Sequence, residues 1–206
     1  MEGSLRATAM DQVTICNLAL SKLGEQSITS LTDGSLEARF CSLHYPVVLQ
    51  QMLQMSNWNF ATKRAQLTQL ASAPLFGWSY AYQLPADYSR MNQFNGFGAS
   101  DSIRSFEIHG NNLLTNDDQA QITYISNSPD QSLFTPGFCR ALVLLLASEL
   151  CKPLAGAENL KISLLAEFKT TMSAASQIDS NDERPERFNY IANSSLVQAR
   201  FVQPIP

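Results

Sequence analysis

The feature that most constrains the fold is a run of seven apolar residues, 141–147, inside the segment from Thr135 to Pro153. Thr135 can accept hydrogen bonds from the free amides of a first helical turn, Pro136 suits the first helical position, and Pro153 marks a stop. A helix between these limits is apolar on every side, so other elements must cover it on several faces. The sequence therefore predicts a buried central helix within a bundle.

The size and charge of the chain exclude several classes of protein. A chain of 206 residues with 45% hydrophobic content fits one moderate domain, or a domain with a sizeable insertion. The net charge of −4 argues against sequence-independent binding of phosphates or anionic membranes by the surface as a whole. The longest apolar run is far shorter than the ~20 residues that span a bilayer, and the first ten residues do not resemble a secretory signal. We expect no membrane segment and folding in a cytoplasm.

Helical spacing of apolar residues predicts two helices before the middle of the chain. Asp11 can cap the first, and Gly24 can end it. The second runs to about Met55 with one apolar stripe, and Pro46 should kink it or begin a new segment. That stripe consists of Leu36, Phe40, Leu43 and Val47.

Two further helices are predicted on either side of the central one. The first of these spans 56–67, capped by Asn57 or Asn59, with Phe60, Arg64 and Leu67 at helical intervals. The other spans 158–178, and one apolar stripe marks its buried face: Leu160, Leu164, Leu165, Phe168, Met172 and Ala175.

Between residues 71 and 131 the helical period gives way to alternation. Strands are predicted at 78–84, 88–94 and 121–126, and the Gly110-Asn-Asn turn predicts a hairpin over 105–115. The fold class expected is α+β: a mainly α-helical bundle with an inserted small antiparallel β-rich region and an extended C-terminal arm. The predicted parts are a flexible N-terminus (1–10), a helical bundle (11–70 and 132–180), the β-rich insertion (71–131) and the arm (181–206).

The residues with chemical potential do not form a catalytic or metal-binding pattern. The four cysteines lie among apolar neighbours without Cys-x-x-Cys spacing, and two isolated histidines accompany them: Cys16, Cys41, Cys139, Cys151, His44 and His109. Gly96-x-Gly98 lacks the context of a phosphate loop, and no nucleophile, Walker or zinc-protease motif occurs. We therefore expect buried thiols, no catalysis, no metal and no cofactor.

The C-terminal arm mixes charged, aromatic and proline residues without a helical period. It is either a frayed tail or an arm that becomes ordered on another subunit, because disordered segments are usually depleted in large apolar residues. The candidate contacts with subunits or partners are Phe188, Tyr190, Leu196, Val197, Phe201, Val202 and Ile205.

Several stretches taken in order resemble one family: 15–25, 38–45, 58–64 (Trp-Asn-Phe-Ala-Thr-Lys-Arg), 82–88 (Tyr-Gln-Leu-Pro-Ala-Asp-Tyr) and 147–168. Together, over about residues 11–180, they resemble the tail adaptor family of tailed bacteriophages, also called tail tubular protein A or head-to-tail connector proteins. The resemblance implies helices with an inserted β-rich region, and copies assembled in a ring, typically of twelve, beneath the portal protein. Such a ring passes genomic DNA from capsid to tail and binds the nozzle or other tail proteins.

The resemblance implies a virion structural protein of the neck, made in the host cytoplasm, that binds its own copies, the portal and tail proteins. An acidic chain suits a channel through which DNA slides without sequence-specific binding. A ring also needs a head-to-tail interface between two different faces of each subunit. The alternatives left open are a tail-completion or terminator protein, and a host helical protein-binding module.

Overall fold

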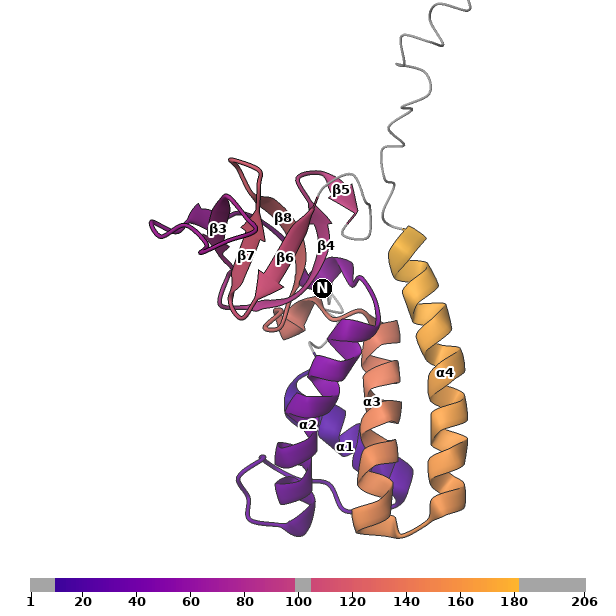
Figure 1. Ribbon diagram of the computed structural model, residues 1–206. Helices are drawn as coiled ribbons and strands as arrows, with labels where there is room; N and C mark the ends of the chain where they lie inside the picture. The colour runs from indigo at the N-terminus through magenta and orange to yellow at the C-terminus, as the bar shows by residue number, and fades with distance from the viewer. Residues whose placement is uncertain (1–9, 99–104, 182–206) are drawn as a thin grey trace, which may run out of the picture.

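The computed structural model describes residues 10–98 and 105–181, which form four α-helices and two antiparallel sheets of four strands each (Figure 1). Helical turns account for 49% of the described residues and strands for 20%. The helices lie at one end and the sheets at the other. We call these parts the helical module, which contains α1 (Gln12–Leu23), α2 (Leu36–Met55), α3 (Pro136–Leu150) and α4 (Glu158–Asn181), and the β module, residues 62–126.

Helix α3 is the centre of the helical module, as its all-round apolar character predicted. Every side chain from Ala141 to Ser148 is buried, and α1, α2 and α4 all pack against this helix. Thr135 accepts a hydrogen bond from the amide of Phe138 at 3.3 Å, so the predicted cap is confirmed. The helix does not stop at Pro153: α3 continues into a π-helical turn, Cys151–Ala155, that ends at Gly156.

The limits predicted for α1 are also confirmed. The Asp11 carboxylate accepts a hydrogen bond from the Thr14 amide at 2.8 Å, and Gly24 ends the helix in the left-handed conformation with φ 77°. Helix α4 covers the predicted range and buries Leu164, Phe168 and Ala175.

The first sheet has the strand order β1 (Thr62–Gln66), β8 (Gln121–Ser126), β4 (Tyr88–Phe94), β5 (Phe97–Gly98). The second has the order β2 (Thr68–Gln69), β3 (Tyr80–Gln83), β7 (Asn112–Thr115), β6 (Phe106–His109). The predicted hairpin at Gly110 is confirmed, because β6 pairs with β7 and His109 lies opposite Asn112. Strand β4 occupies the predicted residues and pairs with β8 and β5.

The β module has a hydrophobic core of its own, and this corrects the expected fold class. Side chains from both sheets form the cluster: Leu67, Tyr82, Leu84, Met91, Phe94, Leu113, Ala120, Ile122 and Tyr124. Two four-stranded sheets with a separate core are more than a small insertion, so the chain is α+β and not a mainly helical bundle.

The helix expected at 56–67 is wrong. Those residues contain one 3₁₀ turn, Asn59–Ala61, followed by strand β1, which pairs along its length with β8. The helical spacing of Phe60, Arg64 and Leu67 therefore did not indicate a helix. Pairing with a strand some sixty residues further along the chain decided the structure, and no local pattern reports such a partner.

The apolar stripe expected to bury α2 is also wrong. Leu36, Leu43 and Val47 are 56%, 64% and 66% exposed, and the side facing the core carries different residues. The buried side consists of Ala38, Cys41, Tyr45, Val48, Met52 and Leu53. Helix α2 is therefore apolar on two sides, and only one of them is covered by the described chain.

Four aromatic rings pack together in the core of the helical module, on α3 and on the segments just before and after the β module. The Trp58 ring lies 4.9 Å from the Phe138 ring, and Phe60 and Phe134 complete the cluster. Trp58 is fully buried, and its indole N–H donates to the Met52 carbonyl at 2.8 Å. Trp58 therefore anchors the core of the helical module.

Candidate functional site

A polar cluster around Asp87 lies where the first sheet meets the helical module. The Asp87 carboxylate accepts hydrogen bonds from Lys63 Nζ at 2.6 Å, Tyr124 Oη at 3.0 Å and Ser126 Oγ at 2.9 Å. The bond from Lys63, together with those from Ser126 and Tyr124, lowers the pKa of Asp87 to about 2 despite partial burial. Burial and the bond to Asp87 raise the pKa of Tyr124 to about 12.

This cluster contains residue types that occur in catalytic sites, but its hydroxyl groups are not accessible to a substrate. Ser126 is fully buried and Tyr124 nearly so, which leaves neither hydroxyl open to a substrate. The cluster instead fixes the junction: the Asp87 carbonyl accepts from the Asn127 amide, and the Asn127 carbonyl accepts from the Gln50 side chain of α2 at 2.7 Å. Lys63 and Asp87 come from two of the stretches that carry the family resemblance, so the fold brings these stretches together.

A second set of polar contacts fixes the end of α4 to the junction. Asp179 accepts a hydrogen bond from the Asn59 amide at 2.9 Å, and the Asn59 side chain donates to the Asp179 carbonyl at 2.6 Å. Arg90 of β4 donates to the Asn57 side chain at 2.6 Å. The residues after α2 are thus tied to both the last helix and the first sheet.

The two histidines and four cysteines do not gather in one site. His44 lies on α2 beside the Phe40 ring, whereas His109 is exposed on β6 and contacts Glu107 at 2.8 Å. All four cysteines are free and buried, which confirms the prediction of buried thiols. Hydrogen bonding with Cys41 and burial raise the pKa of the Cys16 thiol, so the Cys16 thiol stays protonated at neutral pH.

Within residues 10–98 and 105–181, no group of three or more His, Cys, Asp or Glu side chains could hold a metal ion. Among the described helices, none is long and apolar enough to cross a bilayer. The remaining candidates for function are surfaces that present apolar side chains to solvent.

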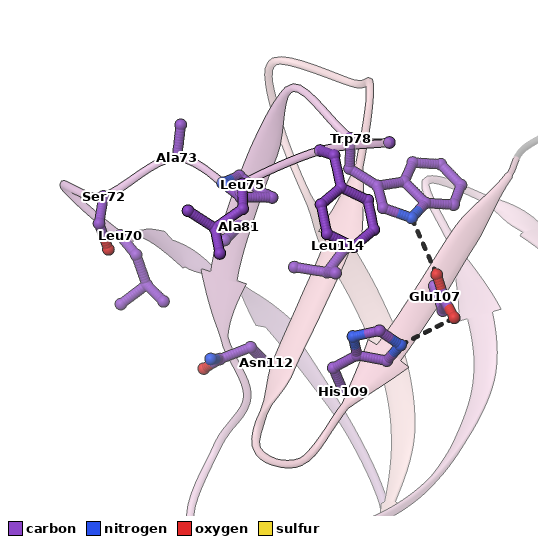
Figure 2. A pocket seen from close by; sticks show the side chains of 13 residues that line it. Leu70, Ser72, Ala73, Leu75, Trp78, Ala81, Glu107, His109, Asn112 and Leu114 are labelled. Carbon is purple, nitrogen blue, oxygen red and sulfur yellow. Dashed lines mark hydrogen bonds and ion pairs between the residues drawn. The ribbon is translucent and has the colours of Figure 1, made fainter.

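The first such surface is the loop between β2 and β3 and the sheet face beside it (Figure 2). The loop leaves an open groove of about 440 Å³ against the outer face of the second sheet. Leu70, Trp78, Ala81 and Leu114 give the groove apolar walls, and Glu107, His109 and Asn112 give it a polar edge. At the tip of the loop, Leu75 is 97% exposed and Phe76 85% exposed. We call these two residues the loop tip.

Hydrogen bonds hold the base of this loop in place. The Trp78 indole N–H donates to Glu107 at 2.9 Å (Figure 2), and the Ser79 amide and hydroxyl both donate to the Asn116 side chain. The bonds from Trp78 and from His109 lower the pKa of Glu107. The loop tip is therefore presented from a base that is fixed by polar contacts.

The second surface is the exposed side of α2, formed by Leu36, Leu43 and Val47. No charged residue occurs between Phe40 and Met55, so this side of the helix lacks solvated charges around Leu43 and Val47, whereas Arg39 lies beside Leu36. We call it the α2 stripe. Exposed, contiguous apolar residues of this kind mark sites of protein association.

The third surface is a groove of about 250 Å³ between α1 and α3. Leu18, Pro136, Cys139 and Val143 form its apolar part. Lys22 and Arg140 stand at its rim, where both pair with Glu167 of α4, at 3.6 Å and 3.2 Å. One carboxylate facing two cations leaves this rim with a net positive charge.

All seven contact residues expected from the sequence, Phe188 to Ile205, lie outside the described residues, so the structure places none of them. Sequence reasoning missed the loop tip, because it used residues 71–77 only as the boundary of the β-rich insertion. A signal was present: two large apolar side chains, Leu75 and Phe76, stand between Pro74 and Gly77 in a loop where solvation favours polar residues.

Comparison of the chain with protein-family models, and with curated proteins, finds no match.

Proposed function

We propose that this chain is a virion structural protein, an adaptor subunit that assembles in a ring, typically of twelve copies, between the portal and the tail of a bacteriophage. The proposal rests on the family resemblance of the sequence. One structural observation supports it: each copy presents exposed apolar surfaces on both modules, the α2 stripe on one and the loop tip on the other.

Two different apolar faces are what a ring requires. A ring closes through heterologous contacts, in which one face of a subunit binds another face of its neighbour, and further faces remain to bind the portal above and tail proteins below. An enzyme would instead need accessible reactive groups, and in the described residues the polar cluster around Asp87 is used for structural contacts.

The charge of the chain is consistent with a channel for DNA. Each copy carries a net charge of −4, and a wall that repels phosphates allows the duplex to slide where a basic wall would bind it. The proposed partners are therefore the chain's own copies, the portal protein and tail proteins, with DNA passing through unbound.

Reconstitution with the portal protein tests the proposal. The purified chain is mixed with portal rings of the phage that encodes it, and the product is imaged by electron microscopy; a symmetric second ring against the portal is expected. A stable monomer that ignores the portal under all conditions contradicts the proposal. Binding to the end of a tail tube would identify a terminator protein instead, and absence from purified virions would favour a host binding module.

A further inference from the structure

The loop tip is an exposed apolar pair, which we call the knob: Leu75 and Phe76 line the open groove beside the second sheet and keep most of their surface in solvent. Leu75 and Phe76 are nearly fully exposed, and no charged residue occurs from Leu67 to Leu84. The hydrogen bonds of Trp78 and Ser79 hold the base of the loop, so presenting the tip costs little conformational entropy. Burial of large, solvent-exposed apolar side chains by a partner lowers the free energy of the complex.

The groove between α1 and α3 has the size and lining of a matching hole. Its volume is about 250 Å³, and an apolar cavity of ~150 Å³ in a protein accepts benzene. There is room for the ring of Phe76 and part of Leu75. Leu18, Cys139 and Val143 supply the apolar contacts such side chains need.

The charges around the knob and the hole are complementary. In the second sheet and its loops, residues 67–84 and 105–120, the acidic residues are Glu107, which already contacts His109, and Asp117 and Asp118; no lysine or arginine occurs there. The rim of the hole carries Lys22 and Arg140 with only Glu167 between them. Opposite electrostatic potentials on two surfaces speed the encounter of the two molecules and fix their relative orientation.

The knob and the hole lie on different modules. Strand β3 and the loop before it stand on the side of the β module away from α4, whereas the hole lies within the helical module (Figure 1). One copy cannot fill its own hole without unfolding the junction around Asp87. Contact between copies is heterologous, which produces a ring when the rotation between copies closes.

We propose that the loop tip of one copy inserts into the α1–α3 groove of a second copy and forms the head-to-tail contact of the assembly. This inference deepens the proposed function, on which it rests for the idea of a ring. The occupant of the groove is a second copy of this chain. Its loop tip is uncharged, has a size that the groove can hold, and lies among acidic residues that face the basic rim.

Two segments outside the described residues are the competing occupants. Residues 1–9 precede Met10 at the edge of the groove, but they offer only Met1 and Leu5 as large apolar side chains. Residues 182–206 follow the end of α4 and are richer in apolar residues. Removing each segment separately distinguishes these occupants from a second copy.

Cross-linking between two singly substituted chains tests the contact. Both carry Cys139→Ala, so that the groove has no thiol of its own; one carries Leu75→Cys, and the other, of larger tagged size, carries Leu18→Cys. Mild oxidation of the mixture is expected to give mainly the disulfide-linked dimer of the two different chains. Dimers of Leu75→Cys with itself, or no cross-link from a concentrated sample, overturn the proposal. So does cross-linking that appears only after residues 1–9 or 182–206 are removed.

Self-association gives a second readout that does not depend on the cross-link. Phe76→Ser is expected to weaken association by at least about tenfold in sedimentation experiments, because burial of the ring is lost. Leu133→Ser, which removes a 57% exposed leucine elsewhere, is the matched control and should leave association unchanged. Equal association of Phe76→Ser and the native chain overturns the proposal. If Phe76→Ser still forms rings on the portal, this contact is wrong while the adaptor function stands.

Discussion

Replacing Asp87 with asparagine should destabilise the protein at neutral pH and have little effect in acid. The carboxylate has a pKa of about 2 in the folded chain against an ordinary value of 3.8. A carboxyl group with that difference stabilises the folded state by about 2 kcal/mol at pH 7. The Lys63 side chain is 48% exposed, and solvent screening lowers the expected loss to about 1–2 kcal/mol.

The direction of the pH effect follows from the lowered pKa. The stabilisation is fully present above pH 3.8, where the unfolded carboxyl is also ionised, and it is lost as the pH falls towards 2. The difference in free energy of unfolding between the native chain and Asp87→Asn should therefore shrink over this interval. Comparison of the two chains is needed because other carboxylates, including Asp11 and Glu107, also have lowered pKa values.

Urea unfolding followed by circular dichroism measures the effect. At pH 7 the midpoint should fall by about 0.5 M, given a slope of ~2–3 kcal/mol per molar urea. Asp118→Asn, at an exposed position of the β7–β8 loop, is the matched control. Equal midpoints for Asp87→Asn and the native chain at pH 7, or a difference that persists undiminished near pH 2, would refute the reasoning.

Three further outcomes are expected. Gly137→Val should lower the melting temperature, because even a Cβ at Gly137 would lie 3.0 Å from the Ala175 Cβ; an unchanged melting curve would contradict close packing of α3 on α4. Leu145→Asp should unfold the chain by burying an unpaired charge, whereas Leu75→Asp at the exposed loop tip should leave the circular dichroism spectrum native. Truncation after Ser180 should leave the chain folded but impair ring assembly on the portal; normal assembly would show that the arm is not needed.

The elements that the sequence predicted well are those whose limits are set locally. Thr135 and Asp11 cap helices through their own side chains, and Gly24 ends α1 in a conformation that suits glycine. The Gly110 hairpin is likewise fixed by its turn residues. In each case the deciding contacts lie within a few residues, so the pattern contains the information.

The elements that were missed depend on distant parts of the chain. Strand β1 exists because β8 pairs with it, and that partner is separated from it by most of the β module. The choice of buried side on α2 depends on where α3 lies, and periodicity alone could not choose between Cys41 and Leu43 on a helix apolar on two sides.

The candidate site was the part least accessible from the sequence. Exposure of Leu75 and Phe76 follows from the packing of the loop against the second sheet, and the α1–α3 groove exists only once Leu18 and Val143 have been brought together. Apolar residues in a loop are visible in the sequence. Whether they are covered is a property of the fold, and here they are not.

If the chain is the proposed adaptor, imaging of the neck of purified virions that contain it tests the central claim most directly. The account predicts a ring of this chain between the portal and the tail, typically of twelve copies, with the loop tip of each copy against the α1–α3 groove of the next. A neck in which the portal contacts the tail without this chain, together with its absence from the proteins of the virion, would contradict the account.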